Sequence, residues 1–159
     1  GHFYQHDVRG AEMARRILRR LKFDNDTTTR VVTLVRWHDR QIESTAKAIK
    51  RALQQFGQET FFDLLALKRA DNLGQAPAFW DRQEIYARLE ALASDILAGG
   101  ACFSRKTLAV TGRDLMAVGM PAGRELGAAL DLLLNAVIDE KVKNEKEALL
   151  QYLFSNESH

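Results

Sequence analysis

Residues 111–127 read TGRDLMAVGMPAGRELG, a stretch in which four glycines are spaced at seven, four and four residues. The apolar residues around Leu115 favour a short helix, and Gly119 is placed to end it. Pro121 suits the first turn of the next helix, which we expect over about 124–138. This stretch therefore predicts a short helix, a turn with glycine, and a longer helix.

Apolar residues also recur at helical spacing on both sides of this stretch. No run of alternating apolar and polar residues reaches the length of a strand. The sequence therefore predicts an all-α fold. The spacing predicts further helices over about 8–22, 44–56, 59–71, 82–97 and 145–154, and one more that carries Val31, Val35 and His38 on one face.

Two of these helices have a definite expected orientation. In the helix over 59–71, Leu64, Leu67 and Asp71 fall on one face. In the helix over 82–97, Ile85 and Leu89 are expected to point inward. A junction near 98–106 divides the predicted helices into two lobes. The first is a body lobe, residues 1–100, and the second is a tail lobe, residues 101–159.

The composition is that of an ordinary globular protein. Hydrophobic residues make up 46% and charged residues 28% of the 159 residues. The longest apolar runs are too short to cross a bilayer, and no signal-peptide pattern opens the chain. The single cysteine, Cys102, cannot build a disulfide framework or a thiolate zinc site. We therefore expect a cytoplasmic protein with no membrane partner.

Charge is unevenly distributed along the chain, although the net charge is only +2. Residues 1–70 carry 14 Lys and Arg against eight Asp and Glu, and residues 101–124 carry four against one. Residues 71–100 carry two against five, and residues 125–159 carry three against seven. Basic patches of this kind are required to bind a phosphate backbone. The alternative is that basic and acidic faces neutralise each other inside the fold, and the sequence leaves both interpretations open.

The glycine-rich stretch contains a candidate phosphate-binding site. Gly123 stands just before a predicted helix, whose first N–H groups point outward at the positive end of the helix dipole. Arg113 and Arg124 flank this position, and Arg105 and Lys106 lie shortly upstream. The alternative is that the glycines only allow helices to pack closely. The four nearby cations favour a nucleic-acid phosphate, bound here without base readout.

A second candidate site contains histidine and aspartate. His38 and Asp71 each fall on a helix face that is otherwise apolar, where an unpaired polar group is costly. Together with His6, they form a candidate site for a divalent metal. The alternative is a core histidine bonded to an aspartate. The neighbouring Asp39 should point away from His38, because adjacent helical side chains diverge by about 100°.

Common catalytic motifs do not occur in the sequence, and we predict no catalytic residue. There is no Gly-x-x-x-x-Gly-Lys phosphate loop, no dinucleotide-binding glycine fingerprint and no Gly-x-Ser-x-Gly elbow. Residues 24–26, Asp-Asn-Asp, imitate a metal-binding motif. Their place between two helices favours helix capping instead.

Two sets of motifs resemble one family. The stretch from Leu108 to Leu150 is similar to the tail of CCA-adding tRNA nucleotidyltransferases. The likeness rests on Thr-Gly-Arg-Asp-Leu-Met at 111–116, on Gly119, Pro121, Gly123 and Gly127, and on Asn-Glu-Lys-Glu at 144–147. The first part of the chain resembles the body of that family, which is similar to the HD phosphohydrolases. The motifs that carry this resemblance are His-Phe-Tyr-Gln-His at 2–6, Gly-Ala-Glu-Met-Ala at 10–14, Trp-His-Asp at 37–39 and Arg-Ala-Asp-Asn at 69–72.

This resemblance implies a parent enzyme that adds C, C and A to tRNA 3′ ends, using CTP, ATP and Mg²⁺. It implies an HD-like body in residues 1–100 and a tRNA-binding tail in residues 101–159. His6, His38 and Asp71 match the later metal positions of the family. The upstream His, the His-Asp pair and the nucleotidyltransferase head have no counterpart in this sequence. We therefore expect a chain that holds tRNA and needs no cofactor, apart from a divalent metal at an incomplete HD site.

Two other functions fit the sequence. A metal-dependent HD phosphohydrolase would need a complete set of metal ligands. A helical dimerisation domain would leave the basic patches solvated. The sequence does not determine the oligomeric state.

Overall fold

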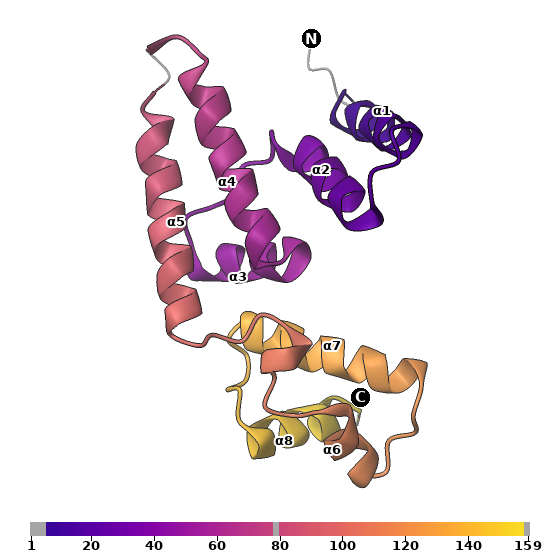
Figure 1. The fold of residues 1–159 in the computed structure, drawn as a ribbon. Coiled ribbons are helices and arrows are strands. Elements are labelled where there is room, and N and C mark those ends of the chain that lie inside the picture. Colours follow the sequence, from indigo (N-terminus) through magenta and orange to yellow (C-terminus); the bar gives the residue numbers. More distant parts are fainter. Residues whose placement is uncertain (1–5, 78–79, 158–159) are drawn as a thin grey trace. The chain divides into compact units, whose positions relative to one another are not determined.

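The computed structural model describes residues 6–77 and 80–157, and these form eight α-helices and no β-strand (Figure 1). The fold is all-α, as the sequence predicts. A short 3₁₀ helix, η2 (Arg105–Thr107), was not expected. None of the described helices is long and apolar enough to cross a membrane. The helices are α1 (His6–Arg20), α2 (Asn25–Trp37), α3 (Ala46–Phe56), α4 (Gln58–Leu73), α5 (Arg82–Ala98), α6 (Gly112–Ala117), α7 (Arg124–Ile138) and α8 (Lys146–Glu157).

Most helix ends lie at residues whose chemistry predicts them. Asp24 caps α2, because its side chain accepts a hydrogen bond from the Thr27 N–H at 2.7 Å. Gly57 and Gly119 have φ angles of 76° and 98°, in the left-handed region that favours glycine. Pro121 is an exception. Since α7 begins at Arg124, Pro121 precedes the first turn of that helix, and the expectation for it is wrong.

The described residues form two compact units. One takes in the described residues up to Ser44 together with Gln55–Leu92, and the other takes in Thr45–Gln54 together with the described residues from Ala93 onward. The body–tail junction expected near 98–106 lies in the second unit. We describe each unit by itself.

In the first unit, α1 lies against α2, and α2 lies against α4. The first two helices approach closely at Gly10, where an added Cβ would lie 3.3 Å from Val35 Cγ1. On α5, Leu89 is buried, as expected, whereas Ile85 is 48% exposed. Most buried residues of this unit lie on α4, and α1, α2 and α5 contribute Ala11, Val32 and Leu89.

The buried face of α4 differs from the expected one. Leu64 is buried, but Leu67 is 39% exposed and Asp71 lies on the surface. The face that the fold covers instead includes Lys68 and Asn72, which are 7% and 1% exposed. It consists of Phe61, Leu64, Leu65, Lys68 and Asn72, which also recur at helical spacing. Two polar residues therefore occupy core positions of this helix.

The second unit has a continuous apolar core. It is built from the segment after α5 and from α6, α7 and α8, and Val110, Leu115, Leu133 and Leu149 are completely buried in it. Cys102 belongs to the same core, and burial raises the pKa of its thiol. Because α6 has only six residues, it is too short to be stable alone and depends on this packing.

Two adjacent leucines of α7 provide a test of this core. Leu133→Ala should lower the free energy of unfolding by about 2–5 kcal/mol, because it removes a completely buried side chain and leaves a cavity. Leu132 is 42% exposed, so Leu132→Ala should cost less than about 1 kcal/mol. Denaturant titrations of both variants measure the difference. Equal losses would contradict the orientation of α7.

Candidate functional site

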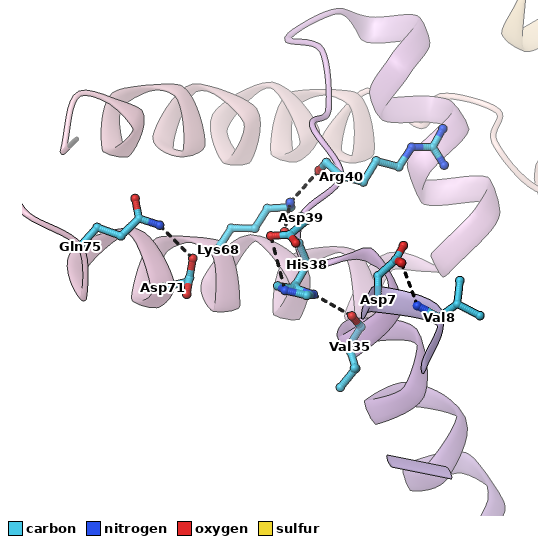
Figure 2. A network of polar contacts seen from close by, with 9 residues as sticks. All are labelled: Asp7, Val8, Val35, His38, Asp39, Arg40, Lys68, Asp71 and Gln75. Carbon is cyan, nitrogen blue, oxygen red and sulfur yellow. Dashed lines mark hydrogen bonds and ion pairs between the residues drawn. The ribbon is translucent and has the colours of Figure 1, made fainter. Parts of the chain in front are cut away.

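His38 and Asp71, two of the expected metal ligands, line one pocket of the first unit, with a volume of about 290 Å³ (Figure 2). His38 is the residue at the C-terminal cap of α2, and Asp71 lies in the last turn of α4. The third expected ligand, His6, begins α1, but its side chain lies outside the described residues. The fold therefore brings two of the three predicted ligands to the same place.

The His38 ring bonds to two groups close to it in sequence. Its Nδ1 lies 2.7 Å from the Val35 carbonyl oxygen, so Nδ1 carries the hydrogen and donates it. Its Nε2 lies 3.4 Å from Asp39 Oδ1. The expectation that Asp39 points away from His38 is therefore wrong. It assumed a continuing helix, but α2 ends at Trp37 and the chain turns there.

Lys68 also lines this pocket, and the sequence interpretation missed it. Its Nζ donates hydrogen bonds to the carbonyl oxygens of His38 and Arg40, the latter at 2.6 Å (Figure 2). Burial lowers the pKa of Lys68 to about 8, while the negative charges of Asp39 and Asp71 oppose that shift. Lys68 therefore carries a proton at neutral pH. A lysine on the stripe formed by Phe61, Leu64 and Leu65 is the signal that could have revealed it.

The pocket does not present a metal-ligand set in the part of the chain that the structure describes. No group of three or more His, Cys, Asp or Glu side chains there could hold a metal ion. Asp71 Oδ2 accepts a hydrogen bond from Gln75 Nε2 at 3.2 Å, and His38 faces Asp39. A divalent site would need more ligands than these. The metal site at His6, His38 and Asp71 stays a prediction.

The candidate phosphate site in the second unit surrounds the start of α7. Gly123 caps that helix with a φ of 135°, and an added Cβ there would have no atom within 4 Å. Lys106, Arg113 and Arg124 are exposed, and no ion pair joins them to any residue that the structure describes. These cations are thus available to an anionic partner.

Arg105 has a different environment from the other three cations. Its Nε and Nη2 donate to the two carboxylate oxygens of Asp131 at 2.7 and 2.5 Å. Its Nη2 also donates to the Gly127 carbonyl oxygen at 3.2 Å. A Cβ on Gly127 would lie 3.9 Å from this guanidinium. Arg105 is therefore tied to α7, and a Cβ at position 127 would make only an ordinary van der Waals contact with it.

The tail motif consists of residues 111–127 and 144–147. Several of its other residues hold α6 and α8 in place. Thr111 and Asp114 form a capping box at the start of α6. Lys146, at the start of α8, donates to Asp114, and these bonds hold the pKa of the Asp114 carboxyl well below its usual range. An added Cβ on Gly112 would lie 3.3 Å from the Leu126 side chain. The motif thus serves helix packing as well as the surface around Gly123.

Asn144 fixes the backbone that follows η2. Its Oδ1 accepts a hydrogen bond from the Ala109 N–H at 2.8 Å, and its Nδ2 donates to the Thr107 carbonyl oxygen at 2.9 Å. One amide therefore satisfies two loop groups next to Lys106. The sequence interpretation quoted Asn144 as part of a motif but gave it no role.

Comparisons with known proteins find similarity to tRNA nucleotidyltransferases. The family described as tRNA nucleotidyltransferase domain 2 matches residues 6–153. The CC-adding tRNA nucleotidyltransferase of Thermus thermophilus is 32% identical over 147 residues, covering 92% of this chain and 32% of that protein. The CCA-adding enzyme of Levilactobacillus brevis is 51% identical over 47 residues, covering 30% of this chain and 12% of that enzyme.

A third relative has a different name and is matched over a shorter part of this chain. The bifunctional uridylyltransferase/uridylyl-removing enzyme of Streptomyces coelicolor is 34% identical over 104 residues, covering 59% of this chain and 12% of that enzyme. No solved structure gives a significant match.

The fold and the tail motif define an all-helical module of the kind found in tRNA nucleotidyltransferases. Because the family match spans most of its length, the chain belongs to the tRNA nucleotidyltransferase domain 2 family. It spans about a third of the length of the Thermus relative.

The amide of Asn144 generates a prediction about the tail. Asn144→Ala should lower the free energy of unfolding by roughly 1–3 kcal/mol, because two hydrogen bonds are lost. Asn25→Ala is the matched control, since no side-chain hydrogen bond joins Asn25 to the described residues. Thermal unfolding compares the two variants. A loss no larger than that of the control would mean that the 107–109 backbone does not depend on Asn144.

Proposed function

We propose that this chain is the tRNA-holding body and tail of a CCA-adding tRNA nucleotidyltransferase. The family match over residues 6–153 carries the proposal. The similarity to a CC-adding nucleotidyltransferase over 92% of the chain supports it. In this proposal residues 1–100 are the HD-like body and residues 101–159 are the tail that binds tRNA.

The start of α7 is the proposed contact with the RNA backbone. The first N–H groups of a helix point at a ligand beyond its end, and the helix dipole favours a negative charge there. Gly123 has no side chain that could cover these groups. Arg124 is the first residue of α7, and Arg113 and Lys106 are exposed cations of the same unit; none of the three forms an ion pair with a described residue. A phosphate group therefore fits this surface.

Arg105 has a supporting role in the proposed RNA contact. Its bidentate bond to Asp131 uses the same face of the guanidinium that would otherwise grip a phosphate. It is also 49% exposed at its side chain, so the remaining N–H groups can reach solvent or a ligand. We assign it a supporting contact, weaker than those of Arg113 and Arg124.

The reaction of the parent enzyme belongs to a part of the protein outside this chain. In the proposal that part adds nucleotides from CTP and ATP with Mg²⁺, and this chain presents the tRNA to it. The alternative, a metal-dependent HD phosphohydrolase, would need ligands in addition to His38 and Asp71. The expected metal at His6, His38 and Asp71 is proposed as weakly bound at most.

One prediction of this proposal concerns the affinity for tRNA and its dependence on salt concentration. Arg124→Ala and Arg113→Ala should each weaken tRNA binding, and each should flatten the log–log salt dependence by roughly one, because one phosphate contact is lost. The loss should be similar across tRNA sequences, since backbone contacts carry no base information. Filter-binding titrations at several salt concentrations measure both effects.

Two further variants separate binding from folding. Arg88→Ala is the matched control, because Arg88 is an exposed arginine of α5, far from this motif in sequence. Gly123→Val should weaken binding and also strain the backbone, because φ at this position is 135°. If Gly123→Val lowered only the melting temperature, while Arg113→Ala and Arg124→Ala behaved like Arg88→Ala, the tail would not be part of the binding surface.

Another prediction of this proposal concerns nucleotide addition. The chain alone should add no nucleotide to tRNA in the presence of CTP, ATP and Mg²⁺, because its sequence lacks the paired-aspartate motif that would hold two metal ions. Incorporation of labelled nucleotide is compared with a reaction without protein. Incorporation above that background would place the catalytic groups within this chain.

A further inference from the structure

The pocket that contains His38 and Asp71 already holds a positive charge. Lys68 is 7% exposed, and its ammonium is bonded to the carbonyl oxygens of His38 and Arg40. The carboxylates of Asp39 and Asp71 act on it electrostatically. Two carbonyl oxygens and two carboxylates are the hard oxygen groups that would also attract a divalent cation.

The side chains that could bind a metal here are already used in other ways. The Nδ1 of His38 donates to Val35, and its Nε2 faces Asp39. The Asp71 carboxylate accepts from Gln75. A divalent ion beside His38 and Asp71 would share the pocket with the Lys68 ammonium, and the two positive charges would repel each other.

The lysine also has a structural task in this pocket. Residues 38–40 leave the end of α2, and the carbonyl groups at a helix end have no partner within the helix. The Lys68 side chain reaches two of these carbonyl groups from α4 (Figure 2). An ammonium group has three N–H donors and no acceptor, which suits it to a ring of oxygens.

We propose that the Lys68 ammonium is the cation of this pocket at neutral pH, in the place that a divalent metal would take beside His38 and Asp71, and that the pocket is a metal-independent centre that holds residues 38–40 against α4. The proposal does not depend on RNA binding. It explains why a chain with HD-like residues would function without a metal at this position.

The test uses the full chain in three experiments: metal addition to the wild-type chain, the Lys68→Met variant, and the Lys68→Ala variant with added metal. First, the wild-type chain is measured with EDTA and with Mg²⁺, Mn²⁺, Ca²⁺ or Zn²⁺. Its melting temperature should be the same in each buffer, and metal analysis should find no stoichiometric ion. Stoichiometric metal that is lost on His38→Ala would overturn the proposal and identify the pocket as a metal site.

Second, Lys68→Met keeps an apolar stem but removes the donors. It should lower the melting temperature by roughly 5 °C, because two carbonyl groups lose their partner. Lys141→Met is the control, since Lys141 is exposed and no ion pair joins it to the described residues. A Lys68→Met chain as stable as the control would contradict the role of Lys68.

Third, Lys68→Ala opens the oxygen-lined space. Mn²⁺ or Ca²⁺ should restore part of the lost melting temperature in this variant and should leave Lys141→Met unchanged. Absence of any restoration would refute the claim that the ammonium occupies a cation position. If Lys68→Ala did not fold in any buffer, the wild-type metal measurement would decide between the two outcomes.

Discussion

Backbone groups in the loops have no helix to satisfy them, and in both units side chains from other segments bond to such groups. In the first unit Lys68 of α4 binds carbonyl oxygens at the end of α2. In the second unit Asn144, just before α8, binds the backbone of residues 107 and 109. Buried or crowded polar groups are costly when unpaired, so these contacts determine where each loop lies.

This constraint separates the tail motif into two kinds of residue. Thr111, Asp114 and Lys146 join the starts of α6 and α8 through hydrogen bonds. Arg113 and Arg124 lie beside these residues in sequence, yet neither is ion-paired within the described chain. A motif that looks uniform in sequence is thus partly structural and partly exposed. Only the exposed part is available to RNA.

The same constraint bears on the pocket that His38 and Asp71 line. A residue that resembles a metal ligand by its place in a motif need not face a metal, because its hydrogen-bond partners decide what its ring or carboxylate can do. His38 meets Asp39 and Val35, and Lys68 supplies a positive charge next to them. Membership of the tRNA nucleotidyltransferase domain 2 family is therefore compatible with a body that serves as a scaffold.

The sequence by itself determined the helical class, most helix ends and the chemistry of the turns, because caps such as Asp24–Thr27 and left-handed glycines act within a few residues. It did not determine which face of α4 is buried. Two sets of residues on that helix have helical spacing, and only packing selects the one with Lys68 and Asn72 over the one with Leu67 and Asp71. It also could not show the partners of Lys68 and Asn144, which lie 28 to 37 residues away along the chain. Contacts across that separation form only when helices pack, so the tertiary structure alone decided them.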